Sequence, residues 1–159
     1  MKAMQTGTIL LTRHAEKPDD PLDPNLAPAG LQRAGRLASY IPDQFGTPAF
    51  VFASAISKHS RRPYETIEPL SKACGLPIDG SFADQDYAAL ADELATNSQY
   101  DGKLVLICWH HGNIPSLAHA LNAKSGGYPN PWDATVFNLI LKFDFTAGMP
   151  EVEQIIEPF

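Results

Sequence analysis

The most apolar stretch of the chain reads Lys103-Leu104-Val105-Leu106-Ile107-Cys108-Trp109. An almost uninterrupted apolar run of this length is typical of a strand that is buried on both faces of a parallel sheet. Similar runs occur earlier in the chain, at Thr8–Thr12 and Ala49–Ala53. Helical patterns follow the three runs, over about Leu31–Tyr40, Arg62–Ala73 and Ile114–Leu121. Three strand-then-helix units predict a mainly parallel sheet with helices on both faces.

The remaining segments complete the expected fold. A further helix is predicted over Tyr87–Ala95. Val136–Phe145 alternates between apolar and polar residues, which predicts an exposed or edge strand. Val152–Ile156 is expected to pair with it around the turn Thr146-Ala147-Gly148. The predicted fold class is therefore α/β: a three-layer α/β/α sandwich with a mainly parallel sheet and an antiparallel edge strand near the C-terminus.

Length and composition agree with one globular domain over residues 1–159. The hydrophobic fraction of 44% and the charged fraction of 19% differ from the balance that keeps chains disordered. No apolar run approaches the ~20 residues that cross a bilayer, and Ile9-Leu10-Leu11 is too short for the core of a signal peptide. We expect a cytoplasmic protein in which Cys74 and Cys108 are reduced.

The distribution of charge indicates the kind of partner. The net charge is −6, from 12 Lys and Arg against 18 Asp and Glu. This balance argues against nucleic acid or an anionic membrane as a partner, because both bind broad basic surfaces. Five of the cations nevertheless fall in two short segments, which contain Arg13, Lys17, Lys58, Arg61 and Arg62. Such clusters in an acidic protein predict attraction of a compact anion.

Basic and imidazole side chains follow each predicted parallel strand. Arg13 and His14 follow the first strand, Ser54 and then residues 58–62 the second, and His110-His111-Gly112-Asn113 the third. The carboxyl ends of parallel strands lie at one edge of the sheet, where open α/β sheets bind their ligands. Converging guanidinium groups match the oxygens of phosphate. A neutral imidazole among these cations can attack phosphorus, so the sequence predicts a phosphate site with a nucleophilic histidine.

Three motifs at these strand ends carry a family resemblance. They are Arg13-His14-Ala15-Glu16, Arg62-Pro63-Tyr64-Glu65-Thr66 and His111-Gly112-Asn113-Ile114. Together they resemble the histidine phosphatase (phosphoglycerate mutase-like) superfamily, and the size of the chain is similar to that of its small SixA-like members. The resemblance implies that His14 is the nucleophile and that Arg13, Arg62 and His111 bind the phosphoryl group, with no metal and no cofactor.

The sequence departs from the family pattern in ways that leave alternatives open. The segment from Ser54 to Arg62 is longer than usual, which leaves Arg61 as a rival to Arg62. His110 precedes His111, so His111 is chosen only because Gly112 follows it. The acid/base carboxylate has no clear counterpart. The candidates for this role are Asp84 and Asp86, with Glu16 behind them, and the further candidates for substrate contact are Lys17, His59 and Asn113.

The expected function is hydrolysis of a phosphorylated small molecule or phosphoprotein through a phosphohistidine on His14. Mutase activity is not expected, because the short connections leave little material for an enclosing lid. One alternative is a phosphate-binding module of the same fold that has lost turnover. Another is a metal site built from Cys108, His110, His111 and a distant carboxylate, although adjacent strand residues point to opposite faces. The sequence does not determine the oligomeric state, and Val136–Phe145 is a candidate dimer contact.

Overall fold

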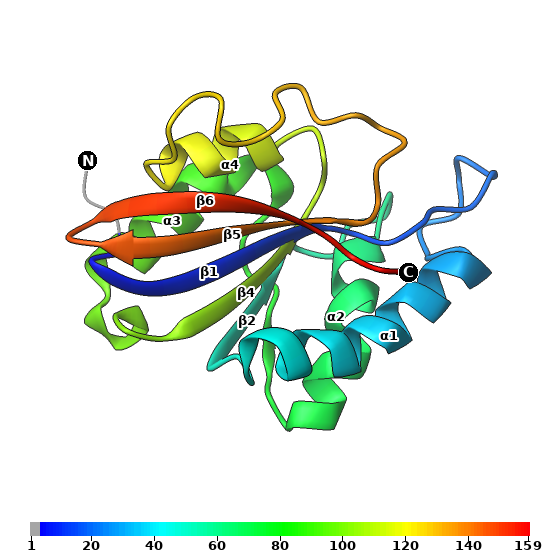
Figure 1. The fold of residues 1–159 in the computed structure, drawn as a ribbon. Helices are drawn as coiled ribbons and strands as arrows, with labels where there is room; N and C mark the ends of the chain where they lie inside the picture. The colour runs from blue at the N-terminus through cyan, green and yellow to red at the C-terminus, as the bar shows by residue number, and fades with distance from the viewer. Residues whose placement is uncertain (1–3) are drawn as a thin grey trace.

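The computed structural model describes residues 4–159, which form one six-stranded sheet flanked by helices (Figure 1). The strands are β1 (Thr6–Arg13), β2 (Phe50–Ala53), β3 (Ile78–Asp79), β4 (Leu104–Trp109), β5 (Leu139–Thr146) and β6 (Met149–Ile156). The helices are α1 (Pro28–Phe45), α2 (Arg62–Cys74), α3 (Tyr87–Thr96) and α4 (Ile114–Ala120). Two short 3₁₀ helices, η1 (Asp84–Asp86) and η2 (Ser98–Tyr100), flank α3.

The helices cover both faces of the sheet, which confirms the predicted three-layer α/β/α architecture. Helices α1 and α2 lie on one face and α3 and α4 on the other (Figure 1). Leu37 of α1 and Ile67 of α2 pack against Leu106 of β4, whereas Leu117 of α4 packs on the side of Ile107. Cys74 and Cys108 are free thiols, as predicted. Between residues 4 and 159 no helix has both the length and the apolarity needed to cross a membrane.

The strand order is β3-β2-β4-β1-β5-β6, and β5 runs antiparallel to both of its neighbours. The predicted C-terminal strand pair is present, joined by a turn in which Ala147 and Gly148 both have positive φ angles, of 52° and 79°. The prediction of an exposed or edge strand at Val136–Phe145 is wrong, because β5 is largely buried between β1 and β6. The alternation comes from Lys142 and Asp144, which are both half-exposed and pair at 3.2 Å. Strand β6 is therefore the edge strand on this side of the sheet, and β3 is the edge strand on the other side.

The parallel register brings the ends of β1, β2 and β4 together. Arg13, the last residue of β1, pairs with Trp109, the last residue of β4, and Ala53 of β2 pairs with Cys108. Hydrogen bonds continue one residue beyond the strands: His14 N donates to the carbonyl of Trp109 at 3.1 Å, and Ser54 N donates to that of Cys108 at 3.1 Å. The three polar segments singled out in the sequence consequently begin side by side.

Gly30 allows α1 to approach the segment that follows β1. A Cβ atom at Gly30 would lie 2.4 Å from the carbonyl oxygen of Glu16, which is backbone and has little freedom to move. We expect Gly30→Ala to lower the free energy of unfolding by about 1–3 kcal/mol. Gly35→Ala in the same helix is the matched control, because its Cβ meets nothing within 4 Å, and should raise stability by about 0.5–1 kcal/mol. Urea denaturation checks both values; equal effects at the two positions would contradict the packing argument.

Candidate active site

His14 is the first residue after β1 and is 3% exposed. Its Nδ1 lies 2.7 Å from the carbonyl oxygen of Ala15. A carbonyl oxygen only accepts hydrogen bonds, so Nδ1 carries the ring proton and Nε2 keeps its lone pair. Burial lowers the pKa of His14 to about 3, with smaller contributions from Arg13, His110 and Arg62, against the opposing effect of the Ala15 hydrogen bond. His14 is thus a neutral imidazole at physiological pH, as a nitrogen nucleophile requires.

Arg13 is 1% exposed and is held by the segment that precedes β5. Its Nη1 donates to the carbonyl oxygens of Ala134 at 2.8 Å and Val136 at 3.1 Å, and its guanidinium lies 3.9 Å from the centre of the Phe137 ring. Burial, and then the charge of Arg62, lowers the pKa of Arg13 to about 10, so it stays cationic at neutral pH. Within the described part of the chain, its buried Nε and Nη2 have no hydrogen-bond partner.

Arg61 and Arg62, which the sequence left as rivals, lie in different surroundings. Arg62 opens α2, donates from Nη1 to the carbonyl of Asp23 at 2.8 Å and lines a cavity at the strand ends. Its pKa is lowered by burial. The side chain of Arg61 is 46% exposed and pairs with Glu65 at 3.9 Å. The geometry therefore favours Arg62 as the arginine of the site.

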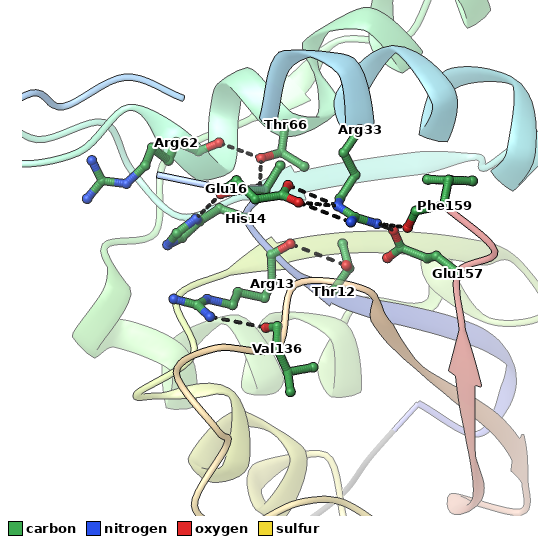
Figure 2. Close-up of polar contacts among 11 residues, drawn as sticks. Thr12, Arg13, His14, Glu16, Arg33, Arg62, Thr66, Val136, Glu157 and Phe159 are labelled. Carbon is green, nitrogen blue, oxygen red and sulfur yellow. Dashed lines mark hydrogen bonds and ion pairs between the residues drawn. The ribbon is translucent and has the colours of Figure 1, made fainter. Parts of the chain in front are cut away.

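Thr66 joins the two segments that carry His14 and Arg62. Its hydroxyl donates to the carbonyl of Arg62 at 2.7 Å, one helical turn earlier, and accepts from the backbone N–H of Ala15 at 2.9 Å. Thr66 is fully buried between them. The spacing Arg-x-x-x-Thr, noted in the sequence as a family motif, thus has a geometric reason that the sequence did not reveal. Figure 2 shows the side chains of Arg13, His14 and Arg62 extending toward the same side from this junction.

The structure brings His110 against His14. The two rings are 5.3 Å apart between centroids and nearly perpendicular, and His110 lines the same cavity as Arg62. His111, which the motif singled out, is half-buried one residue further along, and its pKa is lowered by burial and then by Arg13 and Lys17. His110 and His111 differ in position because a turn begins at His110 and leads into α4. In this turn the carbonyl of His110 accepts hydrogen bonds from the N–H groups of Asn113 and Ile114.

Asp84 and Asp86 both lie in η1 but differ in position. Asp84 is half-buried and lines the cavity with His110 and Arg62, whereas Asp86 is exposed. Among the described residues the buried Oδ1 of Asp84 has no hydrogen-bond partner. The backbone carbonyl of Asp84 is held by the indole N–H of Trp109 at 3.0 Å and the side chain of Asn113 at 3.3 Å. Asn113, expected to contact substrate, therefore positions the Asp84 segment.

The other candidates lie at the margin of the site. The carboxylate of Glu16 accepts from Arg33 Nε and Nη2, each at 3.0 Å, so it is engaged away from the cavity. Lys17 and His59 are exposed. His59 lines the outer wall of the cavity, and Lys17 contributes charge near His111.

Four of the candidates border a cavity of about 490 Å³ at the carboxyl ends of the strands: His59, Arg62, Asp84 and His110. His14 lies against His110. Several buried polar atoms in this part of the molecule have no partner within residues 4–159; besides those of Arg13 and Asp84 they are Arg62 Nε and Ser54 Oγ. Buried donors without partners are costly, and oxygens of a bound anion would satisfy them. Sequence reasoning did not give Ser54 a role, although its place directly after β2 was a signal. No group of three His, Cys, Asp or Glu side chains that could hold a metal ion is found over the described range.

Comparisons with known proteins identify the fold. No family model matches the chain, and no curated protein sequence matches it. Among solved structures, the protein histidine phosphatase SixA in complex with tungstate has a TM-score of 0.66 at 17% identity, with 94% of this chain and 96% of that chain covered. A mycobacterial glucosyl-3-phosphoglycerate phosphatase with inorganic phosphate has 0.61 at 14%, covering 96% and 97%.

A third similar structure carries a different activity in its name. Phosphoglycerate mutase from Bacillus anthracis has a TM-score of 0.64 at 14% identity, with 98% of this chain and 95% of that chain covered. The likeness thus extends over nearly the full length of all three proteins. The chain has the α/β fold of these phosphatases and of phosphoglycerate mutase.

Proposed function

We propose that the protein is a metal-independent phosphatase that acts on phosphoric monoesters or phosphoproteins through a phosphohistidine on His14. The observation that carries this proposal is the state of His14: a buried, neutral imidazole whose Nδ1 is hydrogen-bonded to the Ala15 carbonyl and whose Nε2 keeps its lone pair. Arg13 and Arg62 contribute buried guanidinium nitrogens that have no hydrogen-bond partner among residues 4–159. The names of two similar structures, which hold tungstate and phosphate, support an oxyanion site of this kind.

The geometry supports a two-step reaction. In the first step Nε2 of His14 attacks phosphorus, the bond to the leaving oxygen breaks, and Asp84 gives that oxygen a proton. In the second step Asp84 takes a proton from water, which attacks phosphorus and breaks the N–P bond, releasing phosphate. Arg13, Arg62 and His110 bind the phosphoryl oxygens in both steps, because the charge on these oxygens is what a phosphoryl-transfer site must stabilise. The proton on Nδ1 stays in place throughout.

Hydrolysis of p-nitrophenyl phosphate tests the proposal. We expect turnover that vanadate inhibits and that a chelator leaves unchanged. Loss of activity with the chelator would contradict a metal-independent reaction. Binding of vanadate or phosphate with no turnover on a panel of phosphate esters and phosphoproteins would instead establish the alternative, a phosphate-binding module. Transfer of the phosphoryl group within a phosphorylated hydroxy acid, without release of phosphate, would indicate a mutase.

The role of Asp84 predicts a dependence on the leaving group. Asp84→Asn should lower kcat/KM at least about 100-fold for glycerol phosphate, whose alkoxide leaves only with a proton. The same variant should lose less than about tenfold in kcat/KM with p-nitrophenyl phosphate, because p-nitrophenolate leaves unprotonated and kcat/KM does not include the later hydrolysis of the phosphoenzyme. Asp86→Asn is the matched control, since Asp86 is an exposed carboxylate in the same 3₁₀ helix and should have little effect on either substrate. The opposite ranking of the two variants would assign the proton to Asp86.

A further inference from the structure

A buried ion-pair cluster lies behind the segment that carries His14. The Arg33 cluster consists of Glu16, Arg33, Glu157 and Phe159 (Figure 2). Arg33 Nε and Nη2 donate to the carboxylate of Glu16, each at 3.0 Å. Its Nη1 donates to Glu157 at 2.8 Å and to the backbone carbonyl of Phe159 at 2.6 Å. The side chain of Arg33 is 12% exposed and that of Glu157 is fully buried. All three guanidinium nitrogens are used.

Such a cluster is better suited to fixing geometry than to adding stability. Desolvation of buried ion pairs offsets much of their attraction, so their net contribution to stability is often small. A guanidinium that grips a carboxylate with two parallel hydrogen bonds, however, fixes both its distance and its plane. Arg33 therefore holds Glu16 in one orientation relative to α1.

Glu16 is connected to His14 through a short backbone segment that is held by several hydrogen bonds. The carbonyl of Glu16 accepts from Ala27 N at 2.9 Å, and Gly30 packs against its backbone. The intervening residue, Ala15, donates its N–H to Thr66 and offers its carbonyl to Nδ1 of His14. The direction of the Ala15 carbonyl sets both the tautomer and the tilt of the imidazole ring. Fixing Glu16 consequently fixes the group that orients the nucleophile.

The cluster also reaches the segment that holds Arg13. The backbone N–H of Glu157 donates to the carbonyl of Asn138 at 2.7 Å. Asn138 follows shortly after Ala134 and Val136, whose carbonyls accept from Arg13. Arg33 thus joins two segments that are remote in sequence and that support neighbouring residues of the site.

We propose that Arg33 is a positioning residue for the reaction: by gripping Glu16 and Glu157 together it fixes the orientation of His14 relative to Arg13. The inference rests on the proposed phosphatase function for its kinetic consequence. Its structural part, the orientation of the His14 ring, is independent of turnover.

Kinetics of Arg33→Met test the inference against a matched control. We expect kcat for p-nitrophenyl phosphate to fall at least about tenfold, with KM changed less than about twofold. The side chains that bind phosphate remain in this variant, and only the orientation of the His14 ring is disturbed. Arg36→Met should retain the parent kcat. Arg36 lies on the same helix, and its guanidinium is 5.7 Å from the Phe159 ring, against 5.6 Å for Arg33. Full activity of Arg33→Lys would show that charge suffices and would overturn the positioning role.

An NMR titration of the His14 ring supplies a readout that does not depend on activity. In the parent, burial keeps the ring neutral down to about pH 3, so its signals should not move between pH 8 and 5. In Arg33→Met, water reaching a loosened ring should raise the pKa of His14 into this interval; Arg36→Met should behave as the parent. If Arg33→Met does not fold, Glu16→Gln weakens the same contact with little change in shape and should shift kcat and the titration in the same directions.

The two proposals fail in different ways. A parent protein without turnover, combined with a shifted His14 titration in Arg33→Met, would remove the phosphatase proposal and leave the positioning role standing. An active parent whose kcat and His14 titration are both unchanged by Arg33→Met would overturn the positioning role alone.

Discussion

Replacement of His14 by alanine is expected to abolish the covalent phosphoenzyme and to lower kcat/KM by on the order of 10³-fold or more. The reason is geometric as well as chemical. His14 is the buried imidazole whose ring proton is fixed on Nδ1 by the Ala15 carbonyl. The ring of His110 packs edge-on against that of His14 and helps to hold it in place. Removal of the His14 ring removes the nitrogen that would attack the bound phosphoryl group.

Quenching the reaction with ³²P-labelled substrate in base measures this effect directly, because phosphohistidine is labile in acid and stable in base. The label should remain on the parent protein after a basic quench and be absent from His14→Ala. His119→Ala is the control, since His119 is exposed on α4, and it should incorporate the parent amount of label. Equal labelling of His14→Ala and the parent would assign the nucleophile to another residue.

Removal of the Arg62 guanidinium is the second large effect. Arg62→Met should cost about 2–4 kcal/mol of transition-state stabilisation, which appears as a fall in kcat/KM, because the charge on the transferring phosphoryl oxygens loses one of its two arginine partners. Arg61→Met should cost less than about 1 kcal/mol. Its partly exposed side chain pairs with Glu65 at 3.9 Å, and solvent screens such a pair.

Steady-state kinetics with p-nitrophenyl phosphate and inhibition by vanadate check the ranking of the two arginines. Vanadate should bind Arg62→Met much more weakly than it binds the parent, and Arg61→Met should bind it normally. A larger loss in Arg61→Met would mean that the longer segment after Ser54 places Arg61 over the substrate.

The main elements of the fold could be predicted because a strand that is buried on both faces has an almost continuous apolar sequence. The apolar runs at β1 and β4 follow directly from this burial, and the central positions of the two strands in the sheet explain why they are the clearest. The predicted position of β5 in the sheet was wrong. An edge strand and an inner strand next to a hairpin partner can both have half-exposed side chains on one face, so their sequences show the same alternation. Strand β3 spans only Ile78–Asp79, too short to leave a pattern.

The candidate site could be predicted as far as it depends on strand ends. Arg13 and His14 could be placed at the site because parallel strands stop at one edge, and that rule needs no knowledge of the loops. Arg62 reaches the site from the first residue of α2, beyond the segment that follows β2. The supports of these residues could not be predicted. The carbonyls of Ala134 and Val136 carry no side-chain signal, and they meet Arg13 across more than a hundred residues of chain. Which of His110 and His111 lies against His14 depends on the residue at which the turn before α4 begins. The presence of Gly112 after His111 does not indicate that residue.

The outer edge of β6 has a consequence for how copies of this chain meet. Exposed strand edges invite pairing with a second strand, and Pro residues and charged side chains oppose it. This edge presents Pro150, which has no N–H to donate, next to Glu151 and Glu153, both exposed. A second copy aligned along the same edge would crowd like charges together at neutral pH. Replacement of both glutamates by glutamine should therefore favour self-association, and dilution series of the parent and the variant would show it.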